Sequence, residues 1–218
     1  MSLAARIDNQ PLKQPQPGLG PLWEFHSARI KRRLSGVGLL LLDHFVRLEC
    51  DPNVQSYQPW FSLLPGPEHA YSDALVTLRD GPKELQTARF STSAADGLVL
   101  EHQRIEAECA NKHGWKQRLL TESDIRDAGE YLRNCHAMRP WLSDLHTPAP
   151  AQKRAVLGTI ASEERPITIG KLAVKSGASE PDVVAIVVRE YTQRRLRLED
   201  VHTRPFGRGS LVATLIST

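Results

Sequence analysis

Clusters of basic side chains are the residues of this 218-residue chain with the clearest capacity for chemistry. The first cluster comprises Arg29, Lys31, Arg32 and Arg33. A row of cations can follow the phosphates of a nucleic acid, and it is equally ordinary as the solvated face of a helix. This cluster is therefore a candidate DNA-binding surface, with both interpretations open.

A second set of basic side chains lies near the C-terminus. The helix expected before it starts with Ser179-Glu-Pro-Asp182, and carboxylates at the start of a recognition helix repel phosphate. We therefore expect this part of the chain to bind DNA weakly through the wing, which is the turn between its last two strands, or, by slight preference, to bind a protein instead. The DNA-binding candidates in this set are Arg194, Arg195, Arg204 and Arg208.

The sequence does not contain the patterns typical of a zinc site, a redox cysteine pair, a nucleophile elbow or a phosphate-binding loop. The eight histidines show no metal-ligand spacing, and the three cysteines form no CxxC pair. No glycine pattern forms a nucleophile elbow or a phosphate loop. Ser/His/Asp and Cys/His triads stay open, because their members need not be close in sequence.

The composition indicates a folded protein. Apolar residues make up 40% of the chain and charged residues 24%, which excludes global disorder. A formal net charge of +3 is too small to establish nucleic-acid binding by itself. No apolar run is long enough for a signal peptide or a membrane span, and the scattered cysteines suit a reducing compartment. We therefore expect a cytoplasmic protein without membrane contact.

The first two thirds of the chain predict an α/β domain. Prolines and glycines in residues 1–20 indicate a flexible arm. The apolar spacing of Leu41, Phe45 and Leu48 predicts one face of a helix from about Phe25 to Arg47, with breaks near its glycines. The later elements expected are strands at 54–64, 72–78, 85–90 and 115–120, with helices at 98–113 and from 121.

The C-terminal third has a different pattern. The prolines of Pro140–Pro150 indicate a linker. After it we expect a helix at 152–161, a short strand with a helix up to Gly177, a helix at 179–195, and strands at 196–201 and 210–215. Three helices followed by a two-stranded hairpin is the order of a winged helix.

Three stretches of the chain resemble the TnsA endonuclease subunit of heteromeric transposases. The stretch at 45–58 contains Cys50-Asp-Pro-Asn-Val-Gln-Ser-Tyr57 and is similar to that family's FDPxVxxY element. Tyr71-Ser-Asp-Ala-Leu-Val76 is similar to its YTPDFLV strand, and the stretch at 110–126 is similar to its GWxFxxxTExxIR element. The resemblance implies a restriction-endonuclease-like mixed sheet flanked by helices, followed by a winged-helix domain.

The resemblance also implies metal-assisted DNA cleavage by a helix Glu, a strand Asp and a Glu/Gln-x-Lys pair. Carboxylates would hold Mg²⁺ on the scissile phosphate, and the Lys would orient or activate water. Asp73 matches the strand Asp, although it equally fits an ordinary strand residue. Thr87-Ala-Arg89 stands where Glu-x-Lys is expected, or Gln86-Thr-Ala88 after a one-residue shift. The helix Glu should lie near residues 37–41, which contain only Val, Gly and Leu.

We therefore expect a flexible arm at 1–20, a restriction-endonuclease-like domain at 21–145 and a winged helix at 146–218. The leading hypothesis is a TnsA-like protein of DNA transposition with a degenerate catalytic site at Asp73, Thr87 and Arg89 and no cofactor. By resemblance its partners are double-stranded DNA, an integrase-type transposase and an ATPase regulator. A second hypothesis is an active Mg²⁺-dependent endonuclease in which Asp43, Glu49 or Glu84 joins Asp73. A third is a protein-scaffolding module without a DNA role.

Overall fold

The computed structural model of the chain divides into two compact units. Residues 20–63, 70–93, 97–143 and 146–215 are described, and the predicted arm at 1–20 lies almost wholly outside them. Unit 1 consists of residues up to Leu48 together with Asn53–Asp127, and unit 2 consists of Glu49–Pro52 together with Ala128–Thr218.

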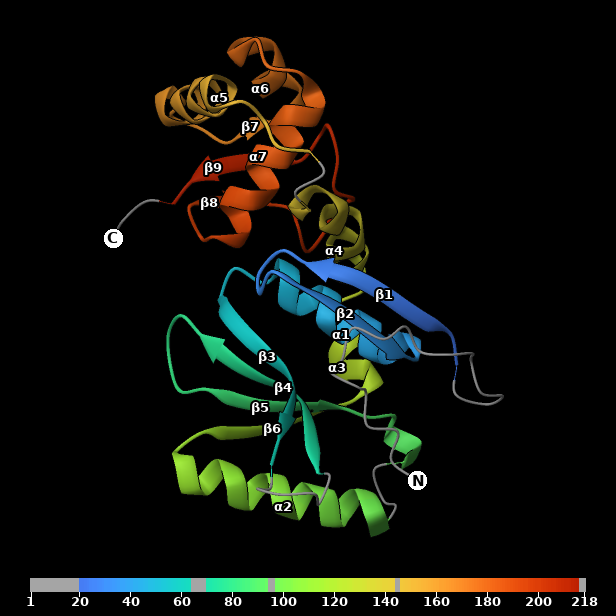
Figure 1. The fold of residues 1–218 in the computed structure, drawn as a ribbon. Helices are drawn as coiled ribbons and strands as arrows, with labels where there is room; N and C mark the ends of the chain where they lie inside the picture. The colour runs from blue at the N-terminus through green and yellow to red at the C-terminus, as the bar shows by residue number, and fades with distance from the viewer. Residues whose placement is uncertain (1–19, 64–69, 94–96, 144–145, 216–218) are drawn as a thin grey trace. The chain divides into compact units, whose positions relative to one another are not determined.

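Unit 1 is a mixed α/β structure (Figure 1). Its four-stranded sheet has the order β3-β4-β5-β6, in which β3, β4 and β5 are antiparallel neighbours and β5 and β6 are parallel. Its elements in chain order are β1 (Leu22–Ser27), β2 (Arg32–Val37), α1 (Leu39–Cys50, its last residues counted in unit 2), β3 (Val54–Ser62), β4 (Tyr71–Leu78), β5 (Glu84–Ala88), the 3-10 turn η1 (Ser91–Ser93), α2 (Gly97–His113), β6 (Lys116–Leu120) and α3 (Glu122–Arg126).

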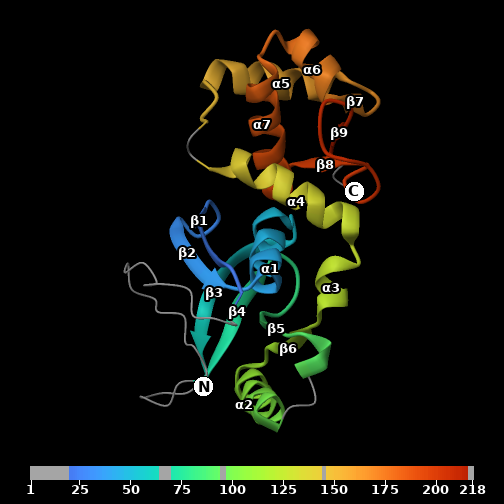
Figure 2. The same ribbon diagram turned by 90° about the vertical axis from the view of Figure 1, so that its right-hand side faces the viewer.

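Helices α1 and α2 cover opposite faces of this sheet, as Figures 1 and 2 show. On the α1 face, Phe45 packs against Ala74 and Val76 of β4 in a cluster that includes the buried Trp23. On the other face, Leu75 and Leu85 pack against α2 through Ala110 and its neighbours. Successive strand residues thus alternate between the two faces, as a pleated strand requires.

The helix predicted over Phe25–Arg47 is only half correct. Its first part is the antiparallel hairpin β1–β2, with Leu22 opposite Val37 and Ser27 opposite Arg32. The helix begins at Leu39, directly after Gly38, whose φ is +89°. The predicted apolar face is present, because Phe45 and Leu48 are buried and Leu41 packs against the same cluster.

Local turn and cap signals in unit 1 are confirmed. Gly81, with a φ of +104°, lies in the turn between β4 and β5, and Gly114, with a φ of +67°, follows the last residue of α2. Thr121 caps α3: its hydroxyl accepts from the Asp124 N–H at 3.4 Å, and the Asp124 carboxylate accepts from the Thr121 N–H at 2.8 Å. Each of these residues lies at the turn or helix end for which the sequence predicted it.

Unit 2 combines helices with a three-stranded sheet of order β7-β9-β8. The boundary between the units differs from the predicted boundary at residue 145, because α4 and the residues before the predicted linker belong to unit 2. The elements are α4 (Gly129–Leu142), α5 (Pro150–Ser162), β7 (Ile167–Thr168), α6 (Ile169–Ser176), α7 (Glu180–Thr192), β8 (Leu196–Leu198) and β9 (Leu211–Thr214).

Helix α7 is the central helix of unit 2. Ser179 caps it through a 3.3 Å bond from the Asp182 N–H, and every residue from Asp182 to Val188 is buried. A recognition helix must expose one face to enter the major groove. The burial of α7 therefore argues against its insertion into a major groove, in addition to the acidic start already noted in the sequence.

No helix in the described ranges is both long and apolar enough to cross a membrane.

Candidate functional site

The site predicted from the resemblance centres on Asp73, which lies on β4 and is 8% exposed. Its Oδ2 accepts a hydrogen bond from the Ala88 N–H at 2.7 Å and another from Nη1 of Arg89 at 3.2 Å. The same Arg89 nitrogen also donates to the Ala88 carbonyl at 2.7 Å. Arg89 is thereby held over the carboxylate, where it forms an ion pair with Asp73.

Thr87 belongs to the same cluster, whereas Gln86 does not. The Thr87 hydroxyl lies 3.1 Å from the hydroxyl of Ser72, the neighbour of Asp73. Gln86 instead donates to Oε2 of Glu84 at 2.6 Å.

Glu106 and His102 of α2 complete the cluster, and neither was predicted from the sequence. Glu106 is fully buried, accepts a hydrogen bond from the Thr87 hydroxyl, and accepts another from the Gln117 amide at 3.3 Å. Nδ1 of His102 lies 3.9 Å from Oε1 of Glu106, while its Nε2 lies 2.9 Å from the Tyr71 carbonyl. The only sequence signal is spacing, because 102, 106 and 110 form one stripe along the helix and Ala110 is buried.

Burial dominates the electrostatics of Asp73. Desolvation raises the pKa of its carboxyl above the usual value, since a buried carboxylate loses its hydration. The Arg89 guanidinium and the Ala88 N–H oppose this rise, and the nearby carboxylate of Glu106 adds to it. The site is therefore a buried acid whose negative charge is compensated mainly by one fixed cation.

The alternative acidic ligands considered for Asp73 have other partners. Asp43 pairs with Arg126 at 2.9 Å, Glu84 pairs with Gln86, and Glu49 is counted in unit 2. Within the described residues, no group of three or more His, Cys, Asp and Glu side chains is arranged to hold a metal ion. The donor set at Asp73 does not fit Mg²⁺, which needs several oxygen ligands, because a guanidinium contacts the carboxylate where such a cation would bind.

His44 is a second buried titratable group in unit 1. It lies on α1 with 2% exposure, and its Nε2 has no hydrogen-bond partner among the described residues. Burial lowers the pKa of His44 to about 3, with further lowering by the charges of Arg47 and Arg118. The ring is therefore neutral at physiological pH.

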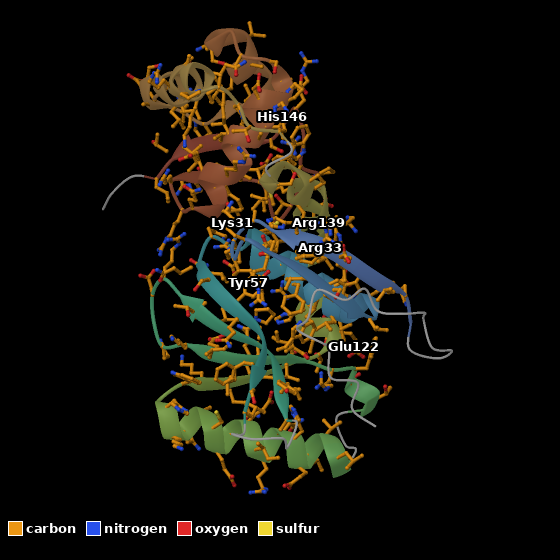
Figure 3. All side chains as sticks on the ribbon, in the orientation of Figure 1. Lys31, Arg33, Tyr57, Glu122, Arg139 and His146 are labelled. Atoms are coloured by element: carbon orange, nitrogen blue, oxygen red, sulfur yellow. The ribbon has the colours of Figure 1, made fainter. Side chains whose placement is uncertain are left out.

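The predicted basic cluster at 29–33 lies on the β1–β2 hairpin, on which Figure 3 labels Lys31 and Arg33. Arg29 is directed inward, since its Nη1 donates to the Val54 carbonyl of β3. Lys31 occupies the turn with a φ of +55°, and Nε of Arg33 lies 3.3 Å from Oε1 of Glu24. Arg32 is exposed. The cluster is thus a hairpin tip rather than a helix face.

The C-terminal candidates are similarly dispersed. Arg194, with a φ of +57°, and Arg195 follow α7, and Nη1 of Arg195 pairs with Oε2 of Glu190 at 3.2 Å. Arg204 and Arg208 lie in the connection between β8 and β9. Of these four residues, only Arg208 lines a cleft described in unit 2.

Comparison of the chain with protein-family models and with curated proteins finds no match to either.

Proposed function

We propose that the chain is a TnsA-like subunit of a heteromeric DNA transposition system that binds DNA and a transposase without cutting DNA itself. The observation that carries the non-cutting role is the ion pair between Arg89 and Asp73 at 3.2 Å. Arg89 occupies the position where the family pattern has Lys, and Thr87 occupies the position of its acidic or amide partner. The expected catalytic positions are thus filled by a hydroxyl and a guanidinium.

The physical reason is that a guanidinium cannot replace either a metal ion or a catalytic lysine. It stays protonated at any working pH, so it cannot accept a proton from water. It also carries a single charge, whereas a bound divalent ion would polarise the phosphate and supply an activated water. The cluster can therefore stabilise unit 1 without performing hydrolysis.

The fold supports this proposal at the level of architecture. Unit 1 has the mixed sheet with flanking helices that the family resemblance implies. Unit 2 runs helix, strand, helix, helix, strand, strand through α5 to β9, an order typical of a winged helix. An integrase-type transposase and an ATPase regulator are the partners proposed on the same resemblance, and co-purification with each of them tests that part.

A supercoiled-plasmid nicking assay in Mg²⁺ and in Mn²⁺ tests the non-cutting role. The wild type and Asp73→Asn should give the same background of nicked circles. Asn keeps an acceptor for the Ala88 N–H while it removes the carboxylate charge, so the variant is a conservative control. Cleavage by the wild type that Asp73→Asn abolishes would overturn the proposal.

A specific observation favours one alternative, an active endonuclease with relocated acids. The buried Glu106 lies beside Asp73, on α2 rather than on α1. In that case Glu106→Gln and Asp73→Asn should each abolish cleavage, while Asp43→Asn should not.

The scaffolding alternative predicts that the chain does not bind duplex DNA at any salt concentration.

A further inference from the structure

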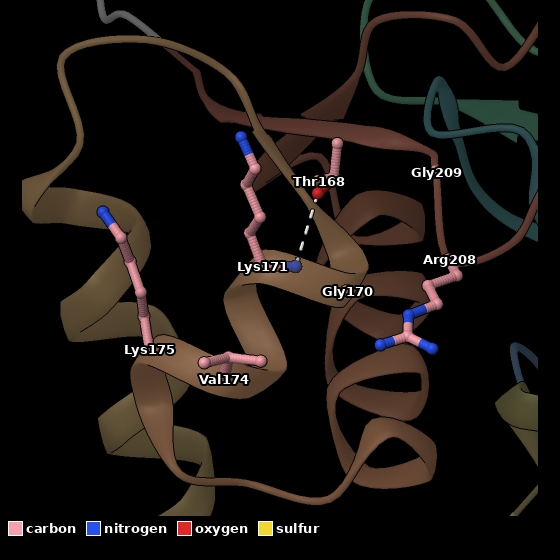
Figure 4. Close-up of a pocket in the computed structure, with 7 residues that line it drawn as sticks. All are labelled: Thr168, Gly170, Lys171, Val174, Lys175, Arg208 and Gly209. Atoms are coloured by element: carbon pink, nitrogen blue, oxygen red, sulfur yellow. Dashed lines mark hydrogen bonds between the residues drawn. The ribbon is translucent and has the colours of Figure 1, made fainter.

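Unit 2 contains a cationic cleft between α6 and the connection that joins β8 to β9. Its volume is about 640 Å³, and its lining includes three cations, Lys171, Lys175 and Arg208, but no acidic residue. Figure 4 shows the two lysines extending from α6 on one side of Gly170 and Arg208 on the other side. Lys171 has no ion-pair partner among the described residues.

The backbone that carries Arg208 is fixed by hydrogen bonds and by close packing against Gly170. The Gly170 N–H donates to the Arg208 carbonyl at 2.9 Å, and a Cβ at position 170 would lie 2.7 Å from Cγ of Arg208. Asn134 of α4 anchors the same connection: its amide donates to the carbonyls of Val201 and Arg204, each at 2.8 Å, and its oxygen accepts from the Phe206 N–H at 2.7 Å.

The attraction of the cleft for anions comes from side chains, since the first backbone N–H groups of α6 are already bonded. The Ile169 N–H donates to the Ser210 carbonyl at 3.1 Å, and the Lys171 N–H donates to the Thr168 hydroxyl at 3.3 Å. Two carboxylates flank the cleft without lining it. Glu163 pairs with Lys175 at 2.5 Å, and Glu180 lies 3.7 Å from Nε of Arg208.

These flanking pairs are exposed on their cationic side, so a stronger polyanion can replace them. The side chains of Lys175 and Arg208 are 54% and 73% exposed in these pairs. Exposed pairs contribute little and are weakened by salt and by competing charges. The cations therefore stay accessible to phosphates.

The remaining lining favours a nucleic-acid backbone over a free anion or an acidic peptide. Val174 lies between the two lysines with 78% exposure, which offers an apolar contact that inorganic phosphate cannot use but a sugar can. Acidic peptides are bound by clusters of arginines, whereas this cleft has a single arginine beside two lysines. The lysines, four residues apart, lie about 6 Å apart along the helix axis, close to the roughly 6.8 Å that two nucleotide steps of one DNA strand span.

We infer that this cleft, and not helix α7, is the surface by which unit 2 contacts the phosphate backbone of duplex DNA. The inference rests on the proposed function and adds Lys171, Lys175 and Gly170 to Arg208 as the residues that form the contact. Helix α7 is buried from Asp182 to Val188, whereas both lysines and Arg208 are exposed.

Fluorescence anisotropy with a short labelled DNA duplex, read between about 50 and 200 mM salt, tests the inference. Lys171→Gln/Arg208→Gln should weaken binding about tenfold or more and reduce the slope of log affinity against log salt by roughly 1.8, or 0.9 for each lost phosphate contact. The matched control Arg154→Gln/Arg165→Gln removes two exposed cations outside the cleft and should change the slope little.

Two further variants separate the shape of the cleft from its charge. Gly170→Ala changes no charge but displaces Arg208, so it should weaken DNA binding, while Glu180→Gln should strengthen binding by removing a competing carboxylate. Circular dichroism shows whether each variant is folded, and Glu180→Gln still tests the inference if Gly170→Ala does not fold.

The outcomes distinguish this inference from the proposed function. No duplex binding by the wild type would overturn both. Wild-type binding that the cleft double variant leaves unchanged, or that the control double variant weakens equally, would overturn the inference and leave the proposed function standing. Displacement of the duplex by an equal charge concentration of poly-glutamate, or by inorganic phosphate, would also overturn it.

Discussion

The substitution Arg89→Ala is the most direct test of how unit 1 tolerates the buried Asp73. Removing one partner of a fully buried pair costs about 3–5 kcal/mol, because the other charge stays buried without compensation. The side chain of Arg89 is 32% exposed and that of Asp73 is 11% exposed, and the Ala88 N–H bond to Asp73 survives. We therefore expect a smaller loss, about 1–3 kcal/mol of unfolding free energy at pH 8.

The loss should depend on pH in a definite direction. Burial raises the pKa of Asp73 above its unfolded value, so between these two pKa values the folded chain holds a proton that the unfolded chain has lost. A destabilising contribution is therefore absent at low pH and develops as pH rises through this window. Arg89 lowers that pKa, so its removal extends the window upward, and Arg89→Ala should cost more at pH 8 than at pH 4.5.

Urea unfolding followed by tryptophan fluorescence measures this loss. In a Trp141→Phe background the three remaining tryptophans all belong to unit 1, so the signal reports that unit. Arg33→Ala is the control: it breaks the exposed pair with Glu24 and should cost less than about 1 kcal/mol at both pH values. In an Asp73→Asn background, Arg89→Ala should also cost less than about 1 kcal/mol. A cost that is equal at the two pH values, or that persists in the Asp73→Asn background, would refute the reasoning.

Three further predictions concern the stability of unit 1. Gly36→Ala should lower the unfolding free energy by about 1–3 kcal/mol through overpacking, because the new Cβ would lie 2.4 Å from the Trp23 ring. The control Gly97→Ala adds a Cβ with nothing within 4 Å, so it should leave stability unchanged or raise it. Thermal melting measures both effects. The wild type should lose roughly 3 kcal/mol of unfolding free energy between pH 7.5 and pH 4 because of His44. At pH 4 the unfolded ring is protonated, whereas the folded ring, with a pKa of about 3, stays neutral. His44→Leu should remove this loss when urea titrations are compared at the two pH values. Thr121→Ala should cost about 1 kcal/mol by removing the cap of α3, and an unchanged melting temperature would contradict the role of that cap.

Elements with local signals were predictable from the sequence. Asp80-Gly81 predicts the turn between β4 and β5 because glycine adopts a positive φ without strain, and the φ of Gly81 is +104°. Gly177 likewise follows α6 with a φ of +67°. In each case the residues that determine the geometry are the residues that adopt it, so no distant contact is needed.

The β1–β2 hairpin was not predictable, because its turn depends on distant residues. The spacing of Ile30 and Leu34 imitates a helix, and the turn contains no glycine, proline or asparagine. Its support is the Ser27 hydroxyl, which accepts the Ile30 N–H at 3.2 Å and the Tyr57 hydroxyl at 3.1 Å. Tyr57 is thirty residues away in sequence, so a local pattern could not reveal this contact.

Glu106 was not predictable as a site residue for a related reason. It lies on a helix whose neighbouring charges, Arg104 with Glu101 and Glu108, form an exposed network typical of a solvated face. Its burial follows from the sheet beneath α2, where the Thr87 hydroxyl and the Gln117 amide provide donors for its carboxylate. A buried acid with two neutral donors is recognisable only after the strands have been placed.

The two proposals both depend on which cations are available to bind phosphate in each unit. In unit 1, Arg89 donates hydrogen bonds to the buried Asp73 carboxylate and to the Ala88 carbonyl. A guanidinium held in this way is poorly placed to bind a phosphate. In unit 2, Lys171 is exposed and has no ion pair in the described part of the chain, and Arg208 forms an exposed pair with Glu180 at 3.7 Å. Lys171 can therefore bind DNA directly, and Arg208 can exchange its weak pair for a phosphate. Since phosphate contacts supply most of the sequence-independent affinity for DNA, the two proposals together predict that the chain holds DNA through unit 2 and that unit 1 does not hydrolyse it.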